Sequence, residues 1–194
     1  MRAFEFWTRR SLILAIATVL GGGLAATGQM PGPPATILLI RHAEKLTDGR
    51  IDLSPVGFER AKVLPQLFDG AAAPHNLPRP DFLFATHQSA KSNRPAETIT
   101  PLSQALGLPI SSEVADKDFA LLAKELLSGK YAGKVVLVAW HHGSIPAFAR
   151  ALGATPPYDP WPETQFDRVW RIDFRDGKVV LTDLPQGLMA GDSK

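Results

Sequence analysis

Three short runs of mainly apolar residues place the strongest constraint on how this chain can fold. The runs cover residues 36–40, 81–86 and 135–140 and are rich in β-branched, leucine and aromatic side chains. Runs of this length and composition predict strands that are buried on both faces. The segments between them predict amphipathic helices. We therefore expect a mostly parallel central sheet with helices on both faces, a three-layer α/β sandwich.

Capping and turn residues mark the other elements. Ser54 followed by Pro55 suits the start of a helix, and Gly107 suits the end of one. Asp176 and Gly177 separate two short segments, which predicts a C-terminal hairpin that adds antiparallel strands at one edge of the sheet. We expect helices over residues 55–68, 95–106, 118–127 and 145–152, a short strand over 108–111, and hairpin strands over 169–174 and 178–184.

The first 25 residues predict an export signal rather than part of the fold. Arg9 and Arg10 precede an uncharged run from Leu12 to Leu20, which is short for a bilayer span, and small residues follow it. The arginine pair resembles a twin-arginine signal. We therefore expect cleavage and a periplasmic or secreted protein that meets the membrane only through this signal. An uncleaved anchor or a buried first helix is the alternative.

Charge and cysteine content exclude several classes of protein. The chain has 21 Lys and Arg against 19 Asp and Glu; without the signal, which holds three arginines and one glutamate, 18 of each remain. A neutral mature chain gives no argument for nucleic-acid binding. The absence of cysteine excludes disulfides, thiolate metal sites and cysteine nucleophiles. We divide the chain into a signal over residues 1–25, a linker over 26–35, one domain over 36–186 and a tail over 187–194.

Arginine and histidine side chains follow the predicted strands. Arg41 and His42 end the first run, Arg94 follows the loop after the second, and His141 and His142 end the third. Ligands of open α/β sheets bind at the carboxyl ends of the strands, so these side chains can converge there. Guanidinium groups grip phosphate oxygens, and a neutral imidazole is a competent nucleophile. The set therefore predicts phosphoryl chemistry.

Four motifs follow one another along residues 36–184. They are Arg41-His42-Ala43-Glu44-Lys45, Leu53-Ser54-Pro55 with Gly57, Arg94 with Thr98, and the run from Val136 to Gly143. In this order and spacing they resemble the histidine phosphatase superfamily, also called phosphoglycerate mutase-like, in its small-domain branch. The resemblance implies the phosphoglycerate mutase-like form of the α/β sandwich.

The resemblance also implies roles for the site residues. His42 is expected to be the nucleophile that forms a phosphohistidine, and Arg41 and Arg94 are expected to bind the phosphoryl oxygens. One of the two adjacent histidines is expected to be the second catalytic group. His141 occupies the usual place, but we favour His142 because the stretch from Trp140 to His142 resembles a subgroup of the superfamily.

An acidic proton donor often comes from the segment before the last parallel strand in this superfamily. Glu113, Asp116 and Asp118 are the candidates here, and the choice among them stays open. Glu44 and Lys45 are expected to shape the pocket rather than to take part in the reaction.

The function that follows is hydrolysis of small phosphomonoesters by an exported phosphatase that needs neither metal nor cofactor. One alternative is a family member that binds a phosphoryl ligand without turnover. Another is a metal-dependent hydrolase, since the ligand types would permit zinc. A mutase ranks below hydrolysis, because the chain is short for the insertions that close over a sugar-acid substrate. The ligands of such a metal site would be His42, Glu44, His87, His141 and His142.

Overall fold

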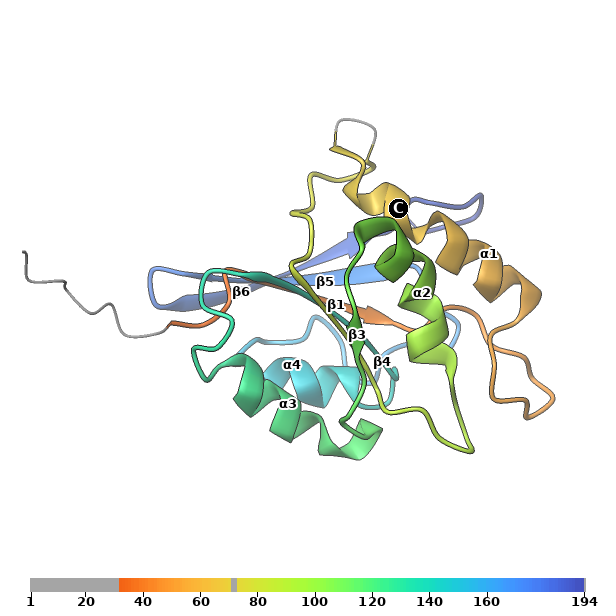
Figure 1. The fold of residues 1–194 in the computed structure, drawn as a ribbon, viewed down its shortest axis with the longest axis horizontal. Coiled ribbons are helices and arrows are strands. Elements are labelled where there is room, and N and C mark those ends of the chain that lie inside the picture. Colours follow the sequence, from red (N-terminus) through yellow and green to blue (C-terminus); the bar gives the residue numbers. More distant parts are fainter. Residues whose placement is uncertain (1–31, 71–72, 194) are drawn as a thin grey trace, which may run out of the picture.

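Six strands form the centre of the fold: β1 Thr36–Arg41, β2 Phe82–Ala85, β3 Ile110–Ser111, β4 Val135–Trp140, β5 Arg168–Arg175 and β6 Lys178–Pro185 (Figure 1). The computed structural model describes residues 32–70 and 73–193. The strands lie in one sheet in the order β3-β2-β4-β1-β5-β6. The first four strands of the chain run parallel, whereas β5 is antiparallel to β1 and β6 to β5. The predicted hairpin at one edge is confirmed.

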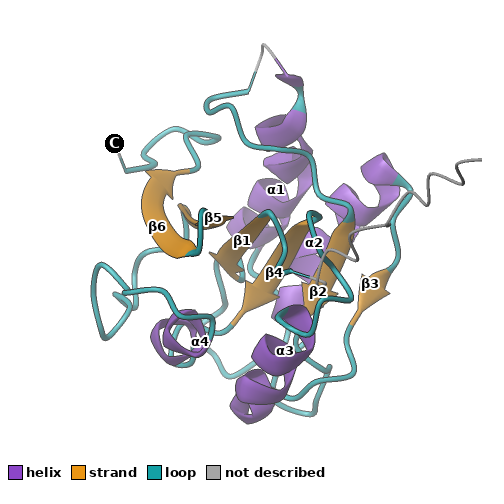
Figure 2. Ribbon diagram, turned by 90° about the vertical axis from the view of Figure 1, so that its left-hand side faces the viewer, coloured by secondary structure: helices purple, strands orange, loops and turns teal. Residues whose placement is uncertain are grey.

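Helices cover both faces of the sheet (Figure 2). On one face, Leu67 and Ile99 are fully buried in one apolar core; on the other, Leu126 and Phe148 are fully buried in a second. The three-layer α/β sandwich predicted from the sequence is therefore confirmed. The helices are α1 Pro55–Val63, η1 Leu64–Phe68, α2 Arg94–Leu106, η3 Asp116–Asp118, α3 Phe119–Leu126 and α4 Ile145–Ala151, where η marks a 3-10 helix.

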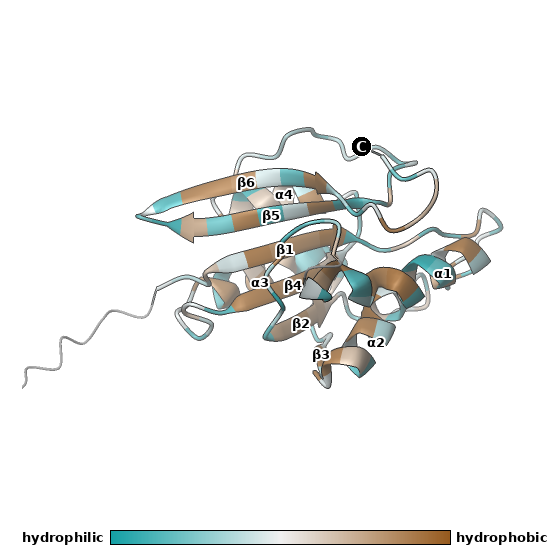
Figure 3. Cartoon of the chain, turned by 90° about the horizontal axis from the view of Figure 1, so that it is seen from above, coloured by the Kyte–Doolittle hydropathy of each residue, from teal (hydrophilic) through white to brown (hydrophobic). Residues whose placement is uncertain are grey.

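The apolar runs of β1 and β4 are uninterrupted because both of their faces are covered. Successive side chains of a strand point to opposite faces. Ile37 and Leu39 thus enter the core beneath α3 and α4, and Leu38 and Ile40 enter the core beneath η1 and α2. The edge strand β6 alternates between exposed and half-buried residues over its first six positions. Figure 3 shows the matching mixture of hydrophilic and hydrophobic residues along β6, whereas β4 is mainly hydrophobic.

Local signals start and stop the elements as predicted. The Ser54 hydroxyl accepts a hydrogen bond from the Gly57 N–H at 3.1 Å and caps α1. Gly107 ends α2 with a φ of 67°. Asp176 and Gly177 turn the β5–β6 hairpin with φ angles of 51° and 70°, the left-handed conformation that a two-residue hairpin turn requires.

The predicted element ends differ from the observed ones by one or two residues, with one larger difference. The helix predicted over residues 55–68 is α-helical only as far as Val63 and continues as the 3-10 helix η1. Pro65 explains the change, because it has no N–H to donate to the carbonyl one turn earlier.

β1 and β4 end side by side at one edge of the sheet. Arg41 is in register with Trp140, and the His42 N–H donates to the Trp140 carbonyl at 3.0 Å. The residues that follow the two strands, His42 and His141, therefore leave the sheet at the same place. This is the position where open α/β sheets bind ligands.

The predicted signal over residues 1–25 lies outside the described residues. The predicted linker over 26–35 is described from residue 32 onward. Within the ranges that the structure describes, no helix is long and apolar enough to cross a membrane.

Candidate active site

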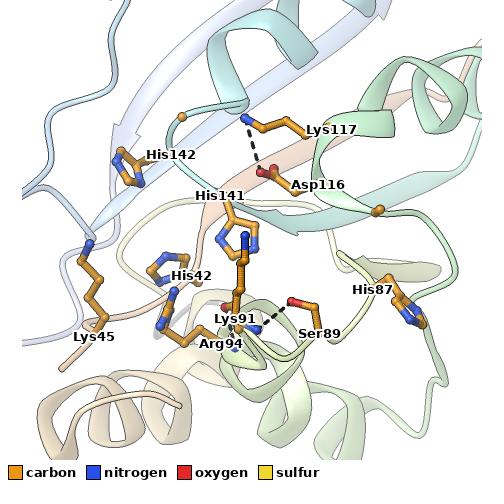
Figure 4. A pocket seen from close by; sticks show the side chains of 13 residues that line it. His42, Lys45, His87, Ser89, Lys91, Arg94, Asp116, Lys117, His141 and His142 are labelled. Atoms are coloured by element: carbon orange, nitrogen blue, oxygen red, sulfur yellow. Dashed lines mark hydrogen bonds and ion pairs between the residues drawn. The ribbon is translucent and has the colours of Figure 1, made fainter. Parts of the chain in front are cut away.

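His42 and His141 lie next to each other at the carboxyl ends of β1 and β4 (Figure 4). Their ring centroids are 5.3 Å apart and their planes meet at 70°. His42 is almost fully buried, with 1% of its surface exposed, and His141 is half-buried. The two strands thus supply a pair of imidazoles, one of which is shielded from bulk water.

The orientation of the His42 ring defines which nitrogen is free to react. Nδ1 lies 2.7 Å from the carbonyl oxygen of Ala43. A carbonyl can only accept, so Nδ1 carries the hydrogen and Nε2 keeps its lone pair. Thr98 holds this loop in place, because its hydroxyl accepts the Ala43 N–H at 2.9 Å. The ring is therefore fixed in one tautomer before any ligand arrives.

The surroundings keep the imidazole of His42 neutral. Burial lowers its pKa well below the usual 6.5, and the nearby His141, Arg41 and Arg94 lower it further. Burial is also the main reason that the pKa of His141 is lowered, against the opposing charge of Asp116. Both rings therefore present an unprotonated nitrogen at neutral pH.

Arg41 is anchored at one end of its guanidinium and lacks partners at the other. Its Nη1 donates to the carbonyls of Pro162, Glu163 and Gln165 at 2.7–3.0 Å, and its Cζ lies 3.8 Å from the centre of the Phe166 ring. Nε and Nη2 are buried and have no hydrogen-bond partner among the described residues. Arg41 is fully buried and is not among the residues that line the cavity. Burial lowers the pKa of Arg41 to about 10, which still leaves it charged at neutral pH.

Arg94 begins α2 and lies on the wall of the cavity beside His42 (Figure 4). Its Nη1 donates to the carbonyls of Arg50 and Ile51 at 3.1 and 3.4 Å, and its Nε is buried without a partner. The Thr98 hydroxyl donates to the Arg94 carbonyl at 2.7 Å. Because the same hydroxyl holds the loop after His42, the spacing of four between Arg94 and Thr98 ties the two parts of the site together.

The two adjacent histidines point in different directions (Figure 4). The preference for His142 does not agree with this geometry, because His141 is the one packed against His42. His142 follows in a turn after β4 and lines the same cavity, where its Nδ1 is buried without a partner among the described residues. Burial, followed by Arg41 and Lys45, lowers the pKa of His142 to about 4.

The structure separates the three acidic candidates that the sequence left open. Asp116 lines the cavity with His141, and one of its carboxylate oxygens is buried without a partner. The indole N–H of Trp140 donates to the Asp116 carbonyl at 3.2 Å and holds this segment against β4. Glu113 lines a different hollow, and Asp118 is exposed and does not line the cavity.

The cavity has a volume of about 490 Å³ and a markedly basic lining. Lys45, Lys91 and Lys117 line it. Lys45 was expected from the sequence to shape the pocket, and this residue does line the cavity, whereas no role was expected for Lys91 or Lys117. Lys91 lies in the loop after β2 and Lys117 lies in η3. Only the sheet brings these two segments close to Lys45, so no local pattern could have identified the group of three. The full lining is His42, Lys45, His87, Ser89, Lys91, Ser92, Arg94, Ala115, Asp116, Lys117, His141, His142 and Gly143.

Glu44 turns away from the cavity into a buried ion network. Arg60, which is 6% exposed, binds the Glu44 carboxylate at 2.8 Å and the Asp192 carboxylate at 2.8 Å. The backbone N–H groups of Leu188 and Met189 also donate to Asp192. Residues assigned to a C-terminal tail therefore hold the loop that carries the nucleophile candidate, a long-range contact that the sequence pattern does not reveal.

The sequence left open a metal site formed by His42, Glu44, His87, His141 and His142. Within residues 32–70 and 73–193, no group of three or more His, Cys, Asp or Glu side chains is placed to hold a metal ion. Glu44 is committed to Arg60, and His87 lies at the outer end of the cavity (Figure 4).

Comparison with known proteins places the fold. No described protein family matches the sequence, and no curated protein matches it either. Solved structures do match. The phosphoserine phosphatase of Entamoeba histolytica, solved in complex with 3-phosphoglyceric acid, is 18% identical with a TM-score of 0.51, and the alignment covers 79% of this chain and 99% of that chain.

A mutant of the same phosphatase in complex with phosphoserine is 14% identical with a TM-score of 0.52, over 79% of this chain and 98% of that chain. A phosphoglycerate mutase from Bacillus anthracis is 15% identical with a TM-score of 0.52, over 80% of this chain and 95% of that chain. At these identities the likeness is one of fold. The chain shares the fold of these phosphatases and of the mutase, which is the phosphoglycerate mutase-like α/β sandwich that its motifs implied.

Proposed function

We propose that this protein is a metal-independent phosphatase that hydrolyses phosphomonoesters through a phosphohistidine at His42. The fold, shared with phosphatases and mutases that act on phosphate esters, supports phosphoryl chemistry in general. The observation that carries the finer proposal is the environment of His42: its Nε2 has a free lone pair, and two nearby arginines, Arg41 and Arg94, have buried nitrogens without partners among the described residues. An anion that brings oxygens to this place would satisfy them.

The reaction proceeds in two displacements. The lone pair of His42 Nε2 attacks the phosphorus, the bond to the ester oxygen breaks, and the leaving oxygen takes a proton from Asp116. Water then attacks the phosphohistidine, the phosphorus–nitrogen bond breaks, and the proton of the water passes to Asp116. Arg41 and Arg94 neutralise the charge on the transferring oxygens, and His141 stabilises the same charge from the end of β4.

Trapping the intermediate tests this proposal. Rapid quench with phosphorus-labelled substrate should give a protein label that survives alkali and is lost in acid, as a phosphoramidate does. Peptide mapping in alkali should locate the label at His42. His42→Ala should lose the label and reduce kcat by at least about a thousandfold.

Each of the other interpretations gives a different result in the same assay. Turnover that stops with a chelator would support the metal-dependent hydrolase. Phosphate or vanadate binding without turnover would support a ligand-binding member. A label on serine or aspartate, or a His42→Ala variant with full activity, would contradict the phosphohistidine.

Export to the periplasm or the medium is part of the proposal and depends on the sequence of residues 1–25 alone. It predicts a mature protein that lacks about the first 25 residues. N-terminal sequencing of the protein recovered from cells is the test, and a mature chain that begins at Met1 would contradict it.

A further inference from the structure

Three lysines line the cavity around its floor, which is formed by His42 and His141. Lys45 follows β1, Lys91 lies in the loop after β2, and Lys117 lies in η3 before α3 (Figure 4). All three are exposed residues that line the same cavity. Asp116 is the one carboxylate in that lining, and it pairs with Lys117 at 3.9 Å. Lys45 and Lys91 have no carboxylate within ion-pair distance in the described part of the chain.

The charge on this rim exceeds what one phosphoryl group needs. The dianionic phosphoryl group of a simple ester is matched by the two arginines, Arg41 and Arg94. The histidines add no positive charge, because burial lowers the pKa of His42, His141 and His142. Clustered lysines repel one another, and a concave site lined by one sign of charge attracts ligands of the other sign.

The size of the cavity agrees with a ligand larger than phosphate. About 490 Å³ lies within the range of small-molecule sites, and Ser89 and His87 extend the polar lining away from His42 (Figure 4). The part of the cavity that a phosphoryl group at His42 would leave empty is therefore lined by the lysines.

We infer that the substrate is a small phosphomonoester that carries at least one further anionic group, a carboxylate or a second phosphate, held by Lys45 and Lys91 with Lys117 at the edge. This inference rests on the proposed phosphatase function and names its substrate class. The lysine charges would speed the approach of the substrate and strengthen its binding. The chemical step would be carried out by His42 and the residues proposed above to act with it.

The test compares matched substrates on the purified full chain. We would measure kcat/KM at low ionic strength for 4-carboxyphenyl phosphate and 4-carbamoylphenyl phosphate, which differ in one charge at nearly constant shape. Phenylene 1,4-bisphosphate distinguishes a second phosphate from a carboxylate. We expect the anionic substrates to be preferred by at least about fivefold, and the preference should fall as salt is added.

Lysine variants then locate the source of the preference. Lys45→Gln and Lys91→Gln should each reduce the preference for the anionic substrate by about two- to fivefold, chiefly through KM. Lys124→Gln is the matched control, because Lys124 is an exposed lysine on α3 that does not line the cavity. It should leave the preference as in the wild type.

The outcomes separate this inference from the proposed function. Equal kcat/KM for the charged and neutral substrates, or a preference that the Lys45 and Lys91 variants retain, would overturn the inference and leave the phosphatase in place. Failure to release phosphate from any of the substrates would overturn the phosphatase and the inference with it.

Discussion

His42 and His141 form the floor of the cavity and are held by the sheet and by hydrogen bonds, whereas Lys45, Lys91 and Lys117 form a rim of exposed side chains. On the floor, the backbone of His42 is bonded to β4 and its ring to the Ala43 carbonyl. On the rim, each lysine comes from a different segment: the loop after β1, the loop after β2 and the 3-10 helix η3. The difference indicates a division of work: the floor is preorganised for one chemical step, and the rim adapts to the part of the ligand that is not transferred.

The largest effect should separate the two adjacent histidines. His141→Ala should reduce kcat by about 100- to 10,000-fold, because this ring faces His42, whereas His142→Ala should change kcat by only a few fold. Steady-state kinetics on both variants, with circular dichroism as the check on folding, measures the contrast. The reverse order of the two effects would restore the preference for His142.

Loss of the buried Arg60, which holds the loop that carries His42, should cause the largest loss of folding stability. Arg60→Leu leaves the buried carboxylate of Asp192 and the half-buried carboxylate of Glu44 without their partner and should cost about 3–5 kcal/mol in the free energy of unfolding, measured with urea. Arg50→Leu is the matched control, because Arg50 pairs with Asp48 at the same 2.8 Å but on the surface. If the two variants lose equal stability, burial is not what makes the Arg60 network strong.

Arg94 lies between the two regions, and its removal should weaken transition-state binding. Arg94→Ala should remove about 2–4 kcal/mol of transition-state stabilisation, which lowers kcat/KM by roughly 30- to 1,000-fold. It should weaken vanadate binding as well. Vanadate titration of the variant checks this, with Arg150→Ala as a control arginine on α4 outside the cavity. Unchanged vanadate affinity would remove Arg94 from the phosphate site.

Acid should destabilise the protein through its buried histidines. The unfolded chain takes up protons near pH 6.5, whereas the pKa of His142 in the folded chain is about 4, so stability is lost as the pH falls from 6.5 towards 4. His142→Gln should make this loss shallower, by at most about 1.4 kcal/mol per pH unit and by less where solvent screens the half-buried ring. Urea unfolding at several pH values measures the slope, and an unchanged slope would contradict the assignment.

The smallest effect is expected on the rim. Lys91→Gln should change the free energy of unfolding by no more than about 0.5 kcal/mol, since its exposed side chain makes no ion pair with the described residues. Urea unfolding of this variant beside Arg60→Leu gives the two ends of the comparison. If Lys91→Gln instead lost about 2 kcal/mol or more in the free energy of unfolding, the rim would have a structural role of its own.

Patterns within the sequence were enough to predict the fold and to bring several of the candidate site residues to one cavity. The apolar runs predict strands buried on both faces, and Ser54, Gly107 and the pair Asp176-Gly177 mark element ends because capping and turn formation depend on residues close together in the chain. Arg41 and His42 could be placed at the site because the carboxyl end of a buried parallel strand is where such sheets bind ligands.

Only the tertiary structure decided the choices that depend on distance between segments. The register of β1 and β4 sets His141, rather than His142, against His42, and the packing of Trp140 brings Asp116, rather than Glu113 or Asp118, to the cavity. The pairing of Arg60 with Asp192 and the meeting of the three lysines join segments that lie far apart in the sequence. No periodicity or spacing records such contacts, because they arise from the way the layers stack and not from the local preference of any residue.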